Sequence, residues 1–251
     1  MNLTTRGTAI LALALAILGW AAGVFGLGLG VVSAPVLTLV LRETVSDLPV
    51  ISLTLNALSC VVIVAVLAPA RLISWKHAIG LSAVAGVVAP FAAWADRSVP
   101  SFITAYAYLA AVLFLVLHFL RPPRGHALPH INWTVLYFGA APAGLVGGFT
   151  GIGPGFALMP GLVVAGMDVR HAAATAAAAS IIPSLTALIP LPCGTAFSQF
   201  SPIALLPLGA ALVGVAMGAR YTFVQTVSLR WQRVFAGFVA VLAIAQFFSL
   251  G

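Results

Sequence analysis

The sequence predicts an all-α, polytopic membrane protein, and three observations support this. Of its 251 residues, 62% are hydrophobic and only 6% are charged, whereas soluble domains carry about a quarter charged residues. Its 11 basic and 4 acidic side chains cannot coat a soluble protein of this length, so lipid must solvate most of the surface. The third observation is a repeat, described below, that divides the chain into two homologous halves.

Apolar runs divide the chain into eight segments joined by short polar connections. They cover residues 8–41, 49–70, 77–95 and 100–120 in the first half, and residues 132–166, 171–191, 201–219 and 229–249 in the second. A spanning helix needs ~20 residues, so six runs each suit one crossing. The first run of each half is too long for a single crossing, and both of these runs carry clustered glycines.

The glycine clusters reveal an internal duplication. The stretch GVFGLGLGVVSAP, residues 23–35, matches GFTGIGPGFALMP at an offset of 125 residues, with four glycines and one proline aligned. Between the halves lies RPPRGHALPH, which has three prolines and is typical of a linker. We therefore expect a first transmembrane repeat at 1–120, a linker at 121–131 and a second transmembrane repeat at 132–251.

The basic residues indicate that the two halves are inverted repeats. If each glycine-rich run enters and leaves the membrane on one face, Arg6, Arg42 and Arg97 share one face and the other eight basic residues share the opposite face. That distribution obeys the positive-inside rule, whereas single crossings split the residues five to six. Three further crossings per half would invert the second half. We expect basic loops in the cytoplasm, both termini outside it, and short or re-entrant pieces of about 17 and 12 residues in the first run.

Three interpretations of the glycine stretches compete. GLGLG has the look of a dinucleotide-binding loop, but such a loop requires a βαβ unit in a soluble domain. Close helix packing through small residues explains part of the glycine content, and also the run HAAATAAAAS. A broken helix would instead open backbone N–H groups, and the positive end of the following short helix, to an anion. This last interpretation assigns substrate binding to Gly26, Gly28, Gly30, Gly151, Gly153 and Gly155.

Polar side chains inside the apolar runs are further candidate ligands, because burying them costs free energy. Ser52, Asn56 and Cys60 share one helix face by their spacing. Ser180 and Ser184 form a comparable pair in the second half. Hydrogen bonding between helices is the alternative role for all of these groups. The side chains expected at the substrate site are Ser33, Asn56, Thr150, Thr175 and Ser180.

The chain offers little for catalysis, metal binding or nucleic-acid binding. No Asp or Glu lies centrally in an apolar run, so a carboxylate proton relay and a carboxylate sodium site are absent. Proton coupling would then fall to the substrate itself or to His118, which otherwise has a structural role. There is no GxSxG, no HExxH and no histidine cluster, so we expect no catalytic residue, metal or cofactor. Basic residues stand singly, which is unlike a nucleic-acid-binding surface.

The glycine stretch at 23–35, its longer counterpart GGFTGIGPGFALMPGLVVAGMDVRHAAATAAAAS and the later LGAALVGVAMGARY resemble the TauE/SafE sulfite exporter family. The resemblance covers nearly the whole chain, although Leu29 and Pro154 stand where that family usually has a third glycine. It implies a secondary transporter that exports small sulfur-containing anions (sulfite, thiosulfate or organosulfonate) across a bacterial plasma membrane. The residues alone indicate only an anion-selective transporter or channel. An anion channel is the nearest alternative, and a membrane-embedded enzyme or assembly factor is a more distant one.

Overall fold

The computed structural model describes residues 5–33, 48–120, 133–191, 202–224, 233–241 and 244, and the regular elements among them are all helices. This confirms the predicted all-α class. The helices are α1 (Thr5–Phe25), α3 (Leu48–Leu67), the 3-10 helix η1 (Ala68–Ala70), α4 (Trp75–Asp96), α5 (Ser101–Leu120), α6 (Trp133–Thr150), α7 (Gly155–Val164), α8 (Val169–Ala187) and α10 (Pro202–Val224). Residues 30–33 and 233–241 are also helical. The expected linker at 121–131, and with it Pro35, Arg42 and Cys193, lies outside the described residues.

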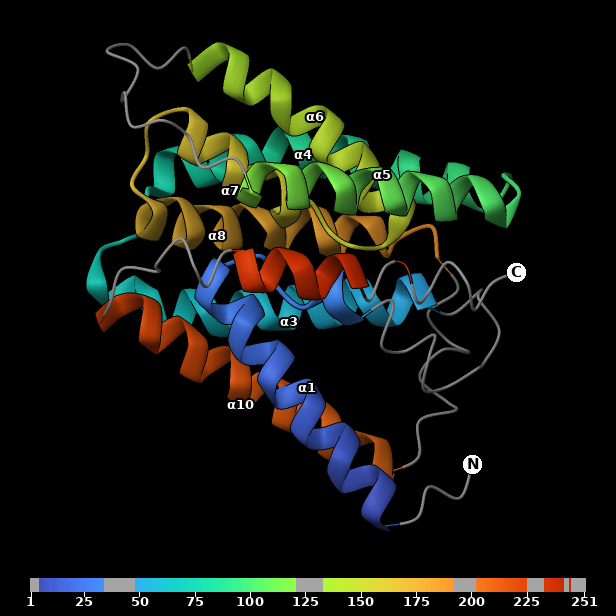
Figure 1. Ribbon diagram of the computed structural model, residues 1–251. Coiled ribbons are helices and arrows are strands. Elements are labelled where there is room, and N and C mark those ends of the chain that lie inside the picture. The colour runs from blue at the N-terminus through green and yellow to red at the C-terminus, as the bar shows by residue number, and fades with distance from the viewer. Residues whose placement is uncertain are drawn as a thin grey trace.

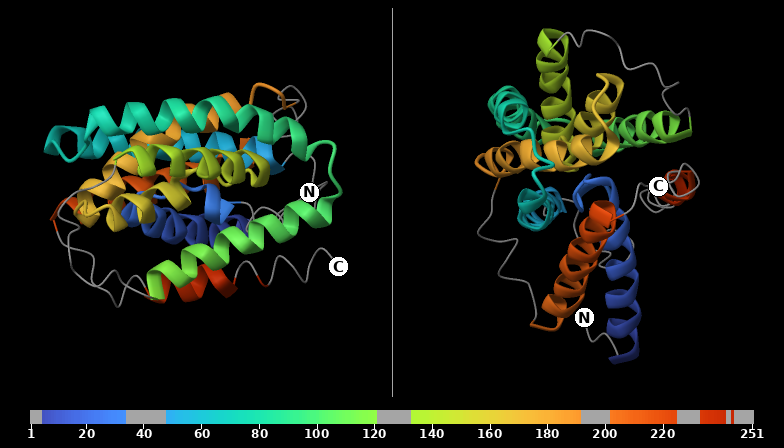
Figure 2. Two further views of the ribbon diagram at one scale, coloured as in Figure 1. Left: turned by 90° about the horizontal axis from the view of Figure 1, so that it is seen from above. Right: turned by 90° about the vertical axis from the view of Figure 1, so that its left-hand side faces the viewer.

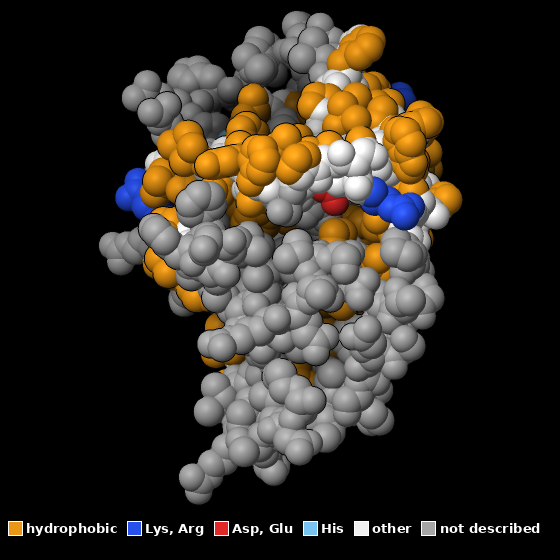
Figure 3. All heavy atoms as spheres, turned by 90° about the vertical axis from the view of Figure 1, so that its right-hand side faces the viewer, with side chains coloured by type: hydrophobic (Ala, Val, Ile, Leu, Met, Phe, Trp, Pro, Cys, Tyr) orange, Lys and Arg blue, Asp and Glu red, His pale blue; other side chains and the backbone are white. Residues whose placement is uncertain are grey.

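The surface is that of a protein solvated by lipid. Three helical segments in the described part of the chain are long and apolar enough to cross a bilayer: Pro49–Ala70, Trp75–Asp96 and Phe102–Leu120. Large apolar side chains point outward, with Phe91 67% and Phe138 75% exposed. Figure 3 shows one face of the molecule, on which hydrophobic side chains cover most of the described surface and charged ones are few. So much exposed apolar area is compatible with a membrane and not with water.

Helix α4 shows how small residues are sorted to the interior. Ile79, Val87, Phe91 and Trp94 are exposed. The buried positions are small apart from one leucine: Ala78, Leu81, Ser82, Ala85, Gly86, Ala89, Ala92 and Ala93. In lipid the hydrophobic effect does not drive helices together, and small residues help by letting their backbones approach closely. The alanine-rich α8 is buried along most of its length for the same reason.

Helices α3 and α8 form the centre of the molecule. Helix α8 packs against α3, α4 and α7, and α3 also packs against α10. In Figure 1, α1 and α10 cross obliquely below this centre, and α6 crosses obliquely above it. The right-hand view of Figure 2 shows the α1–α10 pair and α6 projecting from opposite sides. The centre is therefore enclosed by elements drawn from both halves of the sequence.

The first helix of each half packs on a helix of the other half. Helix α1 lies along α10, and α6 lies along α4. A Cβ atom built on Gly19 or Gly23 of α1 would overlap a backbone carbonyl of α10, and one on Gly144 or Gly148 of α6 would overlap a carbonyl of α4. Gly19 and Gly144, like Gly23 and Gly148, are 125 residues apart. These glycines serve the close helix packing that the sequence left as one interpretation.

Candidate functional site

Two interruptions of the helical backbone lie at equivalent places in the two halves. Helix α1 ends at Phe25 and the next helix begins at Gly30, while α6 ends at Thr150 and α7 begins at Gly155. Both the ends and the new starts are therefore 125 residues apart. Helix α1 has 21 residues rather than the expected ~17, because it begins at Thr5, ahead of the apolar run. We call residues 26–29 the first break and residues 151–154 the second break.

The same backbone conformation recurs in both breaks. Gly26 and Gly28 have φ of 65° and 72°, and Gly151 and Gly153 have φ of 74° and 78°. This left-handed region is unfavourable for residues with a Cβ atom and accessible to glycine. Each break thus uses its glycines at alternate positions to leave the helix and re-enter it. These four glycines differ from the packing glycines of α1 and α6 in needing their φ angles as well as space.

The two breaks touch each other. A Cβ built on Gly30 would overlap the carbonyl oxygen of Ile152, and one on Gly155 would lie 2.9 Å from the carbonyl oxygen of Leu27. Leu27 and Ile152 are themselves 125 residues apart. The contact of Gly30 with Ile152 therefore corresponds to the contact of Gly155 with Leu27, with the roles of the two halves reversed. The backbone turns of the two halves therefore meet at one place in the interior.

Asn56 of α3 lies between the breaks and is fully buried. Its Oδ1 accepts a hydrogen bond from the Gly30 N–H at 3.1 Å, and its Nδ2 donates to Ser184 Oγ of α8 at 2.9 Å. A Cβ on Gly28 would overlap Oδ1, and a Cβ on Gly153 would overlap Nδ2. A single carboxamide thus packs against both breaks and hydrogen-bonds to both halves.

The first break has a second side-chain acceptor. Ser59 Oγ, also from α3, accepts from the Leu29 N–H at 2.8 Å. The equivalent of Leu29 in the second break is Pro154, which has no N–H to donate. No side chain in the described residues accepts from the Gly155 N–H at the start of α7. Ser59 was not predicted, but its place three residues after Asn56 puts it on the same side of the helix.

Two more hydroxyl groups form hydrogen bonds at the start of the helix that follows the first break. Ser33 Oγ and Ser52 Oγ are 2.9 Å apart, and each also lies within hydrogen-bonding distance of the Gly30 carbonyl, at 3.3 and 3.2 Å. Both side chains are buried. The predicted residue Ser33 is therefore beside the first break, and Ser52 joins it from the face of α3 that the spacing indicated.

Thr150 and Ser180 lie at the second break. Thr150 is the last residue of α6, and its hydroxyl donates to the Val146 carbonyl at 2.7 Å. Ser180 Oγ donates to the Ala176 carbonyl at 2.7 Å and lies 3.0 Å from a Cβ built on Gly155. The hydroxyls of Thr150 and Ser180 thus each donate to a carbonyl of the helix that carries them, α6 and α8 respectively. The oxygen of Ser180 faces the start of α7.

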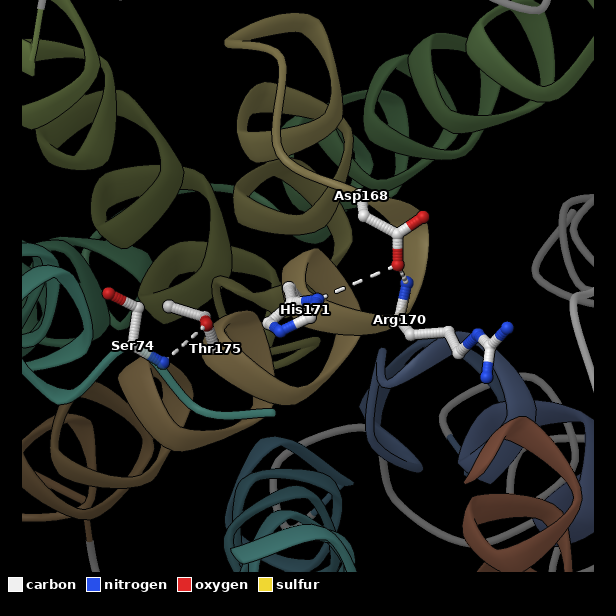
Figure 4. Close-up of polar contacts among 5 residues, drawn as sticks. All are labelled: Ser74, Asp168, Arg170, His171 and Thr175. Carbon is white, nitrogen blue, oxygen red and sulfur yellow. Dashed lines mark hydrogen bonds and ion pairs between the residues drawn. The ribbon is translucent and has the colours of Figure 1, made fainter. Parts of the chain in front are cut away.

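Thr175 has a structural hydrogen bond away from the breaks. Its Oγ1 accepts from the backbone N–H of Ser74 at 3.1 Å, which ties the start of α4 to α8 (Figure 4). At the N-terminus of α8, Asp168 accepts from the Arg170 N–H at 3.2 Å and lies 3.6 Å from His171 Nδ1. Figure 4 places this exposed group along α8 from Thr175. Thr175 was expected at the substrate site, and the sequence could not reveal its present partner.

His118 is half-buried in the last turn of α5. Its ring meets that of Phe119 edge-on at a centroid distance of 5.9 Å, and Phe119 in turn contacts Phe25, the last residue before the first break. No polar contact between His118 and either break is found in the described residues. The histidine is therefore near the first break only through two intervening aromatic rings.

The site is built from neutral groups. Asp96 and Asp168, the acidic side chains in the described ranges, lie at a helix end and a helix N-cap respectively. Within those ranges, no three His, Cys, Asp or Glu side chains gather as they would around a metal ion. The donors near the breaks are backbone N–H groups, hydroxyls and one carboxamide, which is a set suited to an oxyanion.

Comparison with known proteins identifies a family. The model of the family described as "Sulfite exporter TauE/SafE" matches residues 11–246, nearly the whole chain. No match is found among curated proteins or among solved structures.

Proposed function

Because the chain belongs to the TauE/SafE sulfite exporter family, we propose that it is a secondary transporter that exports sulfite, thiosulfate or an organosulfonate. The observation that carries the proposal is the contact between two equivalent glycine breaks in the interior. Broken helices in a membrane direct unpaired backbone donors and helix N-termini at a bound ion. With no carboxylate at the breaks of the described structure, an anion is the favoured cargo.

The proposed binding site is the meeting point of the breaks. Backbone donors would come from Gly26, Gly28, Gly30, Gly151, Gly153 and Gly155, and side-chain donors from Ser33, Asn56, Thr150, Thr175 and Ser180. The hydroxyls now bonded to nearby carbonyls could turn towards substrate oxygens with little backbone movement. Thr175 accepts from the Ser74 N–H, a bond that leaves its own O–H proton able to donate.

We further propose that the two halves are inverted repeats in a bacterial plasma membrane. Helices α1 and α6 each pack on a helix of the other half, and glycines 125 residues apart have similar φ angles; both observations support a duplication related by a pseudo-two-fold axis. The positive-inside rule then assigns the face of Arg71, Lys76 and Arg170 to the cytoplasm and both termini to the opposite side.

A liposome flux assay tests the cargo. Purified protein would be reconstituted and the uptake of sulfite, thiosulfate, sulfate, taurine and sulfoacetate compared, with and without a proton gradient. We expect uptake of at least one sulfur anion above that of protein-free liposomes. If none of the five moves, the assignment of the substrate class fails.

The same assay separates a carrier from an anion channel. A carrier saturates with substrate and is accelerated by substrate on the opposite side of the membrane, whereas a channel shows no such trans-stimulation. Proton coupling is assigned with His118→Ala. Loss of the pH dependence of flux would identify His118 as the proton carrier, and an unchanged dependence would leave the proton on the substrate.

A further inference from the structure

We infer that Asn56 is a positioning residue whose carboxamide ties the two halves together at the breaks, and that this tie must open for an anion to reach the Gly30 N–H. The inference rests on the proposed function for the identity of the entering group. The tie itself is defined by two hydrogen bonds of a single side chain: Oδ1 to the Gly30 N–H at 3.1 Å and Nδ2 to Ser184 Oγ at 2.9 Å.

The first hydrogen bond places a carbonyl oxygen where an oxyanion would bind. The Gly30 N–H opens the helix that follows the first break, and such a donor favours an acceptor with negative charge. In the present structure Asn56 Oδ1 fills that role, and Ser59 Oγ does the same for the Leu29 N–H. An anion can accept from these donors only after the side chains of α3 withdraw. The structure is therefore a closed state stabilised by its own acceptors.

The second hydrogen bond links this event to the other half. Ser184 belongs to α8. The Asn56 carboxamide contacts both the Gly30 N–H and Ser184 Oγ directly, so one side chain joins the first break to α8. The absence of a Cβ atom at Gly28 and Gly153 leaves room for the carboxamide between the breaks, because a Cβ at either position would overlap it. Displacing Oδ1 from Gly30 therefore turns the same planar group away from Ser184. Binding at the first break and release of α8 are coupled as one movement.

Cys60 reports whether the tie is closed. It is fully buried one turn after Asn56 on α3, and its Sγ lies 3.0 Å from a Cβ built on Gly28. A thiol beside the first break reacts with N-ethylmaleimide only when water and reagent can enter. The other cysteine of the chain, Cys193, would be replaced by serine so that labelling reports Cys60 alone.

The experiment compares Ser184→Ala with Ser82→Ala in the Cys193→Ser background, in proteoliposomes and without added anion. Both serines are buried, but Ser82 lies on α4 and its Oγ has no hydrogen-bond partner among the described residues. We expect Ser184→Ala to accelerate the labelling of Cys60 at least tenfold and Ser82→Ala to change it less than twofold. Equal labelling rates in the two variants would overturn the inference.

A double variant tests whether Asn56 and Ser184 act as a unit. Asn56→Ala removes both hydrogen bonds, so adding Ser184→Ala to it should increase labelling no further. Additive increases would show that the two residues act separately and would contradict the tie. Size-exclusion profiles of every variant report on folding, and if Ser184→Ala aggregates, Asn56→Ser, too short to reach Ser184, replaces it with the same expected acceleration.

Adding sulfoacetate to the parent protein separates this inference from the proposed function. If sulfoacetate is bound at the first break, it should accelerate the labelling of Cys60 in the parent and have little further effect in Ser184→Ala. A parent that transports no sulfur anion, with the Ser184→Ala acceleration intact, would refute the proposed function and leave the tie standing. Transport without any Ser184→Ala effect would refute the tie alone.

Discussion

Gly30, at the start of the helix after the first break, lies so close to the carbonyl oxygen of Ile152 in the second break that no Cβ atom fits between them. The equivalent contact, from Gly155 to Leu27, exchanges the halves. Two backbone turns that are far apart in the sequence are therefore in direct contact, with little room for side chains between them. The predictions that follow depend on this crossing and on the helices that support it.

Gly28→Ala should strongly reduce transport while the protein still assembles. The substitution forces a residue with a Cβ into a φ of 72°, which costs about 1 kcal/mol or more, and the Cβ overlaps Asn56 Oδ1. We expect sulfite flux into liposomes to fall at least tenfold. Gly139→Ala is the matched control, because nothing lies within 4 Å of a Cβ there. Full flux in Gly28→Ala would return this glycine to a packing role.

Gly214→Ala should destabilise the contact between α1 and α10. A Cβ at this position would overlap the carbonyl oxygen of Ala16 in α1, and overpacking of this kind costs typically about 1–3 kcal/mol. Thermal unfolding in detergent should show a lower midpoint than that of Gly209→Ala, a site on α10 with open space around the Cβ. Equal midpoints would mean that the contact between α1 and α10 accommodates the added methyl group without loss of stability.

Thr186→Val should be destabilising, and less so when Pro90 is replaced. Pro90 lacks the N–H that would reach the Gly86 carbonyl within α4, and Thr186 Oγ1 of α8 donates to that carbonyl at 2.9 Å instead. Loss of the hydroxyl should cost about 1 kcal/mol. In a Pro90→Ala background the new backbone N–H can bond to Gly86, so the cost of Thr186→Val should shrink. A double-mutant cycle by thermal unfolding measures the difference, and the same cost in both backgrounds would exclude this compensation.

The proposed inverted arrangement predicts the side of the membrane on which the chain ends. A C-terminal fusion to alkaline phosphatase should be active, because that enzyme folds outside the cytoplasm, and a fusion to green fluorescent protein should be dark when exported in the unfolded state. A fusion placed after Lys76 should lie in the cytoplasm, so its phosphatase should be inactive and its green fluorescent protein fluorescent. A fusion placed after Arg97 should behave like the C-terminal fusion. A fluorescent C-terminal fusion would contradict the inverted model.

The breaks could be located from the sequence because their glycines carry a steric requirement. Left-handed φ angles at Gly26, Gly28, Gly151 and Gly153 exclude most other residues, so glycine is needed at each of these four positions. The packing glycines Gly19, Gly23, Gly144 and Gly148 could not be told apart from them, because a glycine in the sequence does not reveal whether it needs a φ angle or a close neighbour.

Hydrogen-bond partners were the part that the sequence could not supply. Asn56 and Thr175 were both expected at the substrate site, yet Asn56 hydrogen-bonds to both halves and Thr175 accepts from the Ser74 N–H. Which helix packs on which face depends on contacts between residues more than 100 positions apart. Three helices that are both long and apolar enough to cross a membrane are found in the described residues, where six single crossings were expected along the whole chain.

The packing of the first helix of each half on a helix of the other half has a consequence for biosynthesis. Helix α1 leaves the ribosome long before α10, the helix against which its glycines pack. Until α10 is synthesised, the glycine-lined side of α1 is covered only by lipid or by the insertion machinery. Assembly of the interior is therefore delayed until the chain is nearly complete, and a nascent chain cut short before α10 leaves its earliest helix without a partner.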